Sequence, residues 1–324
     1  MGDPAGVGGE ITLRAWLARR ATGPVFVALD DPDRLTALAT SLGLSISIQI
    51  ITEISKVNEV FPYALPVLPV RLAEPVQPGR SNPANAPAVL RSIEQAAALT
   101  LGGELAGVVT NPIHKAALYA AGFRHPGHTE FLAELTGAVT KPIMMLSCPA
   151  LRVVPVTVHA SLQDAIAMLD TAAIVTATRI TAAAMRWDFG VQMPRLAIAG
   201  LNPHAGESGA LGREEITIIA PAIKILLAEG HDVSGPWSPD TMFTADAREK
   251  YDVAICMYHY QGLIPLKTLD MHHGVNVTLG LPIVRTSPDH GTAFDIAGKG
   301  VADASSLIAA LDLAAALAAR RTSV

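Results

Sequence analysis

Three histidines stand at matching places in this chain, each just after a run of apolar residues. His159 closes "VVPVTVHA", His204 follows "RLAIAGLNP", and His259 follows "DVAICMY". Such runs predict buried strands, and the carboxyl ends of parallel strands meet at one edge of a sheet. Three imidazoles at that edge could bind a divalent metal ion and leave positions open for substrate. A lone histidine at a strand end is more often a hydrogen-bonded structural residue, so the prediction depends on all three lying together.

Two other side chains could act at the same edge. Asp240, in "SPDTMF", could supply an oxygen ligand or orient a histidine, and its structural alternative is the N-cap of the following helix. In "CMYHYQGLIPLK" we expect Gly262 to turn the chain so that Lys267 reaches the anionic end of a substrate. Asp240 and Lys267 are therefore the candidate catalytic residues.

Two groups of residues could bind an anion. "GHTEFLAEL" places His128 and Thr129 before a predicted helix, where free N–H groups and the helix dipole favour a phosphate or carboxylate, and a simple Thr129 cap is the alternative. Lys267, Asn276 and Arg285 could together hold a doubly anionic small substrate. As solvated surface residues, these three would need no further explanation.

The stretch "SPDHGTAFDIAGKGVAD" is the most specific on the chain. It has no apolar periodicity and many glycines, so we predict a loop whose backbone closely approaches another group. Near the amino terminus, "GDPAGVGGE" does not match the G-x-G-x-x-G fingerprint, which disfavours a Rossmann coenzyme site.

Short β-branched runs alternate with alanine-rich segments, for example "PVFVALD" with "DPDRLTALATSLG" and "LRVVPVTVHA" with "SLQDAIAML". This alternation predicts βαβ units and an α/β fold. Apolar spacing predicts a helix at 84–102, and another at 303–321 with Asp303 or Ser305 as its N-cap. The proline-rich stretch from Pro66 to Pro83 is expected to be an irregular connection.

The composition narrows the class of protein. The 324 residues could form one large α/β unit or two domains, and only 5% are aromatic and 16% charged. The net charge of −5 with scattered basic residues argues against a nucleic-acid partner. Cys148 and Cys256 each adjoin an apolar run, which indicates buried thiols and a reducing compartment. No apolar run approaches the roughly 20 residues of a membrane helix, and a cytoplasmic protein is expected.

The loop "HGTAFDIAGKG" resembles the adenosine-binding loop of the isocitrate and isopropylmalate dehydrogenases. This resemblance implies coenzyme contacts from His290, Gly291, Thr292 and Asp295. A carboxylate at Asp295 would accept the ribose hydroxyls and repel a 2′-phosphate, so NAD is expected rather than NADP.

Nearly the whole chain resembles the 4-hydroxythreonine-4-phosphate dehydrogenase (PdxA) family, through motifs such as "TNPIHKAAL", "LNPHAGESG" and "GVNVTLGLPIVRTSPDHGTAFDIAG". The resemblance implies two α/β domains with the active site in the cleft between them, as in isocitrate and isopropylmalate dehydrogenases. We expect residues 1–127 with 290–324 to form the first domain. Residues 128–289 would form the second, which carries the metal ligands and the probable dimer interface.

The implied reaction is the metal-dependent oxidation of 4-phosphohydroxy-L-threonine by NAD, followed by decarboxylation to 3-amino-2-oxopropyl phosphate. The family's metal ligands match His159, His204 and His259, and zinc, magnesium or cobalt could serve. Its substrate contacts match one further set of residues: His128, Thr129, Lys267, Asn276 and Arg285. The family's active unit is a homodimer whose metal site draws ligands from both subunits.

Two departures from the family pattern stand out. The family usually reads His-Asp-Gln where this chain has His259-Tyr260-Gln261, so a phenol replaces a carboxylate beside the expected metal. Family members also carry a first β-strand before the "GDPAG" loop, and here Met1 directly precedes that loop.

Other functions stay open at this point. Relatives of this type oxidise threonate or erythronate 4-phosphate, or aromatic cis-dihydrodiols. The anion-binding residues favour a phosphorylated acid over a dihydrodiol, but do not separate the phosphorylated acids. A non-catalytic binding protein on the same fold is the alternative from another class.

Overall fold

The computed structural model describes residues 1–321, and their contacts divide them into two compact units. The first unit comprises Met1–Pro142 and Leu281–Ala319, and the second comprises Ile143–Gly280 with Arg320 and Arg321. This division places 128–142 and 281–289 with the first unit. The domain boundaries predicted from the sequence differ there and stay a prediction.

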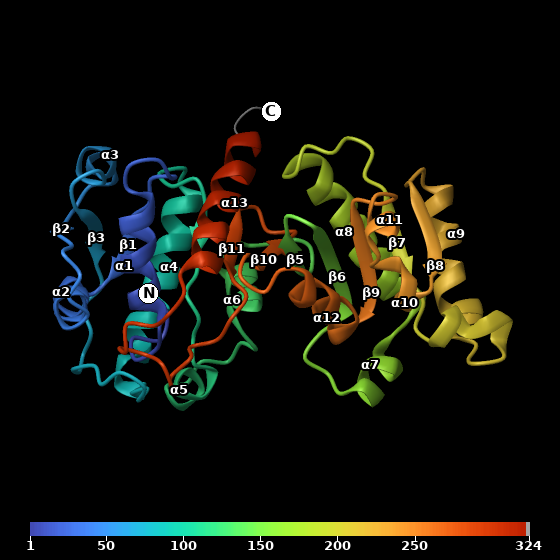
Figure 1. Cartoon of the computed structure of the whole chain (residues 1–324), viewed down its shortest axis with the longest axis horizontal. Coiled ribbons are helices and arrows are strands. Elements are labelled where there is room, and N and C mark those ends of the chain that lie inside the picture. Colours follow the sequence, from blue (N-terminus) through green and yellow to red (C-terminus); the bar gives the residue numbers. More distant parts are fainter. Residues whose placement is uncertain (322–324) are drawn as a thin grey trace. The chain divides into compact units, whose positions relative to one another are not determined.

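The second unit is built on one sheet, in the order β10-β5-β6-β9-β7-β8 (Figure 1). Its strands are β5 (Ile143–Cys148), β6 (Leu151–Thr157), β7 (Leu196–Ala199), β8 (Val233–Trp237), β9 (Val253–Tyr258) and β10 (Val275–Leu279). Strands β6, β9, β7 and β8 are parallel, whereas β5 runs antiparallel to both β6 and β10. The predicted α/β fold is confirmed, with β5 as an antiparallel strand inside the sheet.

Helices and short turns connect these strands. They are α7 (Leu162–Met168), α8 (Thr171–Trp187), η3 (Pro203–Gly209), the π-helical turn η4 (Glu215–Ile219), α9 (Ala220–Ala228), α10 (Pro239–Met242), α11 (Ala245–Arg248) and α12 (His259–Leu269). Ser161 caps α7 and Asp170 caps α8, each by accepting a backbone N–H.

Gly262 lies inside α12 and makes no turn, so that prediction is wrong. A Cβ atom on Gly262 would lie 2.9 Å from Cβ of Val153 and 3.1 Å from Sγ of Cys256. The glycine is therefore needed because the helix packs directly on β6 and β9. This close packing fixes the direction in which α12 leaves His259.

The first unit holds a parallel three-stranded sheet of β1 (Ala28–Asp30), β3 (Leu65–Pro69) and β2 (Ile48–Ile50), and a parallel pair of β4 (Val108–Val109) and β11 (Arg285–Pro288). Its helices are α1 (Gly8–Arg19), α2 (Pro32–Ser41), α3 (Val57–Val60), α4 (Ala86–Leu101), α5 (Lys115–Ala120), α6 (His128–Leu135) and α13 (Ser305–Arg321), with the short turns η1 (Ile54–Lys56) and η2 (Pro83–Asn85). The predicted helices at 84–102 and 303–321 are confirmed. The expected irregular connection begins as strand β3, so that prediction is wrong for Pro66 to Pro69.

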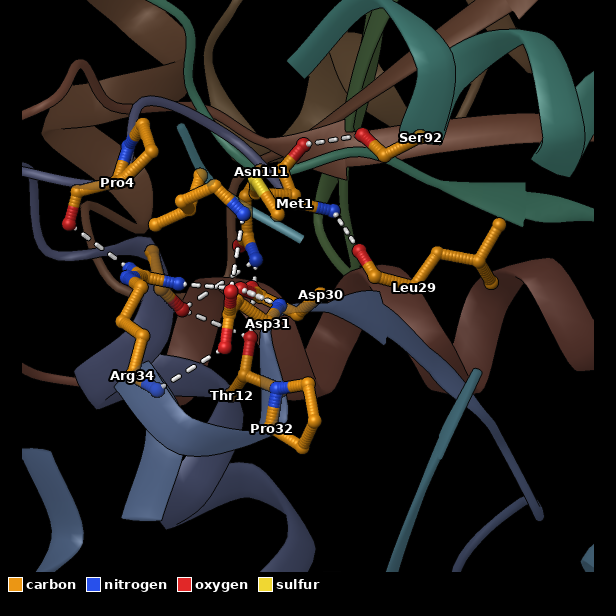
Figure 2. Close-up of polar contacts among 12 residues, drawn as sticks. Met1, Pro4, Thr12, Leu29, Asp30, Asp31, Pro32, Arg34, Ser92 and Asn111 are labelled. Atoms are coloured by element: carbon orange, nitrogen blue, oxygen red, sulfur yellow. Dashed lines mark hydrogen bonds and ion pairs between the residues drawn. The ribbon is translucent and has the colours of Figure 1, made fainter. Parts of the chain in front are cut away.

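The amino terminus lies inside the first unit. The amino group of Met1 donates to the carbonyl oxygen of Leu29 at 2.8 Å, beside the ion pair of Arg34 with Asp30 (Figure 2). Met1 is one of the residues that line a cavity of about 210 Å³, together with residues 24–30 and 105–111, among others. Among the described strands, β1 pairs only with β3. The edge of β1 opposite β3 therefore has no strand partner among these residues.

The cysteines and the hydropathy of the helices bear on two further expectations from the sequence. Cys148 and Cys256 are both buried free thiols, as predicted, and burial raises the pKa of Cys256. Among residues 1–321, no single helix is long and apolar enough to cross a membrane, although the bent pair α7 and α8 passes by length and composition alone.

Candidate active site

The three histidines follow three parallel strands that are neighbours in the sheet. Thr157 of β6 pairs with Tyr258 of β9, and Ile198 of β7 pairs with Ile255 of β9. The carboxyl ends of these strands therefore lie at one edge, as the sequence predicts. His259 is the first residue of α12, directly after β9.

Two of the histidines come close together. The ring centroids of His159 and His259 lie 5.7 Å apart. Two imidazoles bound to one tetrahedral zinc ion have centroids roughly 5 Å apart, given zinc–nitrogen bonds of about 2 Å. Within residues 1–321, no three side chains of histidine, cysteine, aspartate or glutamate are grouped to hold a metal ion. The separation of this pair fits a shared metal ion, and no third ligand is grouped with the pair among the described residues.

Both His159 and His204 have an uncommon backbone conformation. Their φ angles are 56° and 52°, in the left-handed region that residues other than glycine rarely occupy. Strain of this kind persists only where surrounding contacts impose it, and it is concentrated at functional sites. The backbone conformation thus supports the prediction that both histidines belong to a functional site.

Asp240 is an exposed residue in the first turn of α10. The cap of this helix is Ser238, so the alternative reading of Asp240 as the N-cap is wrong. The Ser238 hydroxyl donates to Oδ1 of Asp240 at 2.5 Å, and this bond is the main cause that lowers the pKa of Asp240. The charge of His204 lowers it further, so the carboxylate lies within electrostatic range of a candidate ligand.

Gln261 contributes to this edge, and the sequence reasoning missed it. Its Oε1 accepts from the backbone N–H of Met257 at 2.6 Å, and its Nε2 donates to the carbonyl oxygen of Gly200 at 2.7 Å. The buried amide therefore ties the end of β9 to the end of β7. The position of Gln261, a polar residue two places after the candidate ligand His259, was the signal in the sequence that could have revealed it.

Lys267 and Asn276 also belong to the second unit. Lys267 lies half-buried in the last turn of α12, and Asn276 lies half-buried in β10, opposite Leu146. Tyr260, which replaces the family carboxylate, is 63% exposed with its ring centroid 5.7 Å from that of His259. The structure gives no reason for a phenol at this position.

Two residues predicted to bind an anion, His128 and Arg285, belong to the first unit. Helix α6 starts at His128 after the uncapped Gly127, so the alternative of a Thr129 cap is wrong. Arg285, only 4% exposed, donates from Nη2 to Oγ1 of Thr110 at 2.7 Å. Burial lowers the pKa of Arg285 to about 10, opposed by Glu130. A guanidinium this deeply buried favours an anionic ligand.

The imidazole of His128 is held neutral. Burial lowers its pKa well below 6.5, and the positive charges of Arg285, the amino terminus and Lys115 act in the same direction. Its Nε2 atom is buried and makes no hydrogen bond within the described residues. The positive charges of Arg285 and Lys115 near an unbonded buried nitrogen make this a place where an anion with a hydrogen-bonding oxygen would be stabilised.

The depressed pKa of His128 predicts a pH-dependent stability. Between its folded and unfolded pKa values the unfolded chain binds the extra proton, so the free energy of unfolding should rise from pH 5 to pH 7. Urea unfolding at several pH values should show that His128→Gln flattens this rise. His273→Gln, which removes an exposed histidine, should not. An equal slope in His128→Gln and the parent protein would contradict the assignment, although part of the slope also comes from His231, whose pKa burial lowers too.

The predicted coenzyme loop is held against the amino-terminal segment. The N–H of Val7 donates to the carbonyl oxygen of Thr292 at 3.0 Å, and a Cβ on Gly6 would lie 2.8 Å from that oxygen. Figure 2 shows the segment's own anchor, in which Arg34 donates to the carbonyl oxygen of Pro4 at 2.9 Å. The predicted close approach of the loop backbone is thus confirmed.

The residues proposed to touch the coenzyme are open to a ligand. Nε2 of His290 is buried and makes no hydrogen bond among residues 1–321, and a Cβ on Gly291 would meet no atom within 4 Å. Asp295 is exposed. A cavity of about 650 Å³, within the usual range for small-molecule sites, lies beside this loop and is lined by Pro4, Arg34, Leu38, Leu72 and Gly298, among others.

Comparisons with known proteins point to one family over nearly the full chain. The family model described as pyridoxal phosphate biosynthetic protein PdxA matches residues 22–314. The 4-hydroxythreonine-4-phosphate dehydrogenases of Caulobacter vibrioides and Bradyrhizobium diazoefficiens are 54% and 51% identical, each over 99% of this chain and 96% of the relative.

Solved structures give the same result. The 4-hydroxythreonine-4-phosphate dehydrogenase of Klebsiella pneumoniae superposes with a TM-score of 0.87 at 37% identity, over 98% of each chain. A terephthalate 1,2-cis-dihydrodiol dehydrogenase from Burkholderia xenovorans LB400 has a TM-score of 0.63 at 29% identity, over 98% of this chain and 96% of that one.

Fold and relatives together define an α/β dehydrogenase, an oxidoreductase that acts on a CH–OH group and uses a nicotinamide coenzyme. Within that class, the chain belongs to the family of pyridoxal phosphate biosynthetic protein PdxA.

Proposed function

We infer that this protein oxidises the C3 hydroxyl of 4-phosphohydroxy-L-threonine with NAD. The observation that carries this inference is 54% identity, over 99% of the chain, to a 4-hydroxythreonine-4-phosphate dehydrogenase. Hydride passes from C3 to NAD, the hydroxyl proton is released, and 2-amino-3-oxo-4-phosphooxybutanoate forms. This β-keto acid then loses CO2 to give 3-amino-2-oxopropyl phosphate.

The substrate's anionic groups are proposed to bind the residues described above. His128 and Arg285 present a buried, positively charged environment, and the first turn of α6 adds backbone N–H groups near Thr129. Lys267 and Asn276 of the second unit are proposed as further contacts. Fixing the phosphate and carboxylate orients C3 toward the coenzyme, which is a large part of catalysis in a two-substrate reaction.

His159, His204 and His259 are proposed to hold one divalent ion. When bound, zinc, magnesium or cobalt would stabilise developing negative charge on the substrate oxygen. Asp240, through its proximity to His204, is proposed to orient that imidazole or accept a proton, and Lys267 to act at the anionic end of the substrate.

NAD is the proposed coenzyme, bound by His290, Gly291, Thr292 and Asp295. The unbonded Nε2 of His290 and the space over Gly291 support this proposal. The exposed Asp295 carboxylate could accept the ribose hydroxyls and would repel a 2′-phosphate, which favours NAD over NADP.

A homodimer is proposed because helices next to two candidate ligands expose apolar side chains. On α12, Tyr260 and Ile264 are each 63% exposed and one helical turn apart. On α7, which begins three residues after His159, Leu162 and Ile166 are 63% and 49% exposed with the same spacing. A second copy covering these faces could supply the third histidine that the pair of His159 and His259 lacks.

This dimer gives a direct prediction. Ile264→Asp should convert the protein to a monomer in size-exclusion chromatography with light scattering, and should lower turnover at least about a hundredfold because the metal site loses a ligand. Leu227→Asp, a matched change at a 52% exposed leucine on α9, should leave both unchanged. A dimeric, active Ile264→Asp protein would rule out this interface.

The likeness to a cis-dihydrodiol dehydrogenase makes a second activity testable. NADH formation should be measured with 4-phosphohydroxy-L-threonine, threonate 4-phosphate, erythronate 4-phosphate and a cis-dihydrodiol, each with and without a chelator. We expect the first substrate to give the highest kcat/KM and the chelator to remove activity. Higher kcat/KM for another compound would reassign the substrate, and a protein that turns over none of them would fit the non-catalytic alternative.

A further inference from the structure

The segment that carries His204 has an unusual backbone, which we term the left-handed turn (residues 204–208). The φ angles of His204, Ala205, Gly206, Glu207 and Ser208 are 52°, 50°, 78°, 43° and 57°. For residues with a Cβ atom this conformation is unfavourable, because Cβ approaches the following carbonyl oxygen. Four of the five have a Cβ atom, so contacts from outside the turn must hold it.

The residues just before the turn are bound by one buried carboxylate, that of Glu215, which is 4% exposed. Its Oε1 accepts from the backbone N–H groups of Leu201 and Asn202, both at 2.7 Å. Its Oε2 accepts from Nδ2 of Asn202 at 2.9 Å. The carboxylate thus fixes the residues that enter the left-handed turn.

The turn also wraps closely around this carboxylate. A Cβ atom on Gly206 would lie 2.5 Å from Oε2 of Glu215, and one on Gly200 would lie 3.3 Å from Oε1. Glycine is needed at Gly206 both for this approach and for its φ of 78°. The position of Glu215 therefore explains Gly200 and Gly206 in "GLNPHAGESG".

A carboxylate is required here, and an amide would not replace it. Three donors converge on its two oxygens, whereas a glutamine would present an NH2 group to at least one of them. Burial opposes ionisation of Glu215, but the hydrogen bonds from Asn202 and Leu201 lower its pKa. Glu214 also accepts from Nδ2 of Asn202, at 2.7 Å, but the backbone N–H groups of Leu201 and Asn202 donate to Glu215 instead.

We propose that Glu215 is a positioning residue for His204, which holds the left-handed turn and so sets the direction from which the imidazole meets the metal ion. This inference rests on the proposed role of His204 as a ligand. Gln261 supports the same arrangement from the other side, since it binds the carbonyl oxygen of Gly200 just before the turn. Residues that orient metal ligands usually affect metal affinity by about 10–100-fold.

The test is a cobalt(II) titration of the full-length protein, which follows the visible absorption of the bound ion. Glu215→Gln should raise the cobalt Kd at least about tenfold and shift the visible spectrum. Glu214→Gln, the matched neighbouring change, should stay within about twofold of the parent. Adding Ala205→Gly to Glu215→Gln should recover part of the affinity, because glycine adopts the left-handed conformation without the Cβ penalty.

If Glu215 only stabilised the fold, the result would differ. Glu215→Gln would then lower the unfolding temperature but keep the cobalt Kd and spectrum within about twofold of the parent, and the proposal would fail. If Glu215→Gln does not fold, Asn202→Ala can replace it, because this change removes the Nδ2 donor to Oε2 of Glu215. The cobalt Kd and the visible spectrum of Asn202→Ala are then compared with those of the parent.

His204→Ala separates this proposal from the proposed function. If His204→Ala binds cobalt as tightly as the parent, the metal assignment itself is wrong. If His204→Ala loses cobalt while Glu215→Gln keeps it, only the positioning role of Glu215 is wrong.

Discussion

Replacing Arg285 by methionine is expected to lower kcat/KM for 4-phosphohydroxy-L-threonine by about a thousandfold, equivalent to about 4 kcal/mol of transition-state stabilisation. The guanidinium is 4% exposed and can donate charge-assisted hydrogen bonds to an anion in a poorly hydrated environment, where such bonds are strong. Its hydrogen bond to Oγ1 of Thr110 is to a neutral group.

Stability measurements on the same variant separate binding from architecture. A buried charge costs several kcal/mol in desolvation, and an apolar side chain of similar size is often neutral or stabilising in its place. Urea unfolding of Arg285→Met should therefore give an unfolding free energy equal to or above that of the parent. If activity and stability fell together, Arg285 would be a structural residue instead.

The control for Arg285 is Arg195→Met. Arg195 is exposed and pairs with Asp252 at 2.9 Å, far along the sequence from the proposed substrate contacts. Exposed ion pairs of this kind contribute at most about 1 kcal/mol. Arg195→Met should keep full activity, so a loss there would indicate that general charge, and not the buried position of Arg285, governs substrate binding.

The parts of this site that were predictable from sequence are those fixed by strand periodicity. The apolar runs before His159 and His259 had to be buried strands, and parallel neighbours must end at one edge. The 5.7 Å separation of the two rings follows from that edge. His128 was found in the same way, because a helix must start where "TEFLAEL" begins.

The parts that were not predictable depend on contacts between distant residues. Gly262 reads as a turn in sequence, but its role is set by Val153, more than 100 positions earlier. The antiparallel direction of β5 depends on pairing with β10, which no local pattern encodes. The left-handed turn at His204 contradicts local preference, and the residues that enter it are held by the buried carboxylate of Glu215, more than ten positions later.

The largest effect is expected for His259→Ala, which should lower metal-dependent turnover by at least about a thousandfold. Removing one of three imidazoles leaves too few ligands to hold the ion at the substrate oxygen. Chelator should then have little further effect on the variant, whereas it should bring the parent down to the same rate. His273→Ala removes an exposed histidine near the end of α12 and should keep both the rate and the sensitivity to chelator.

Metal binding can also be measured without turnover, which makes this prediction independent of the substrate. An ion that binds only the folded protein stabilises it by about 2.7 kcal/mol at a hundred times its Kd. Added zinc or cobalt should therefore raise the unfolding temperature of the parent and of His273→Ala, but not of His259→Ala. An equal rise in all three would show that the ion binds elsewhere, and the close approach of His159 and His259 would then need an explanation other than a shared metal.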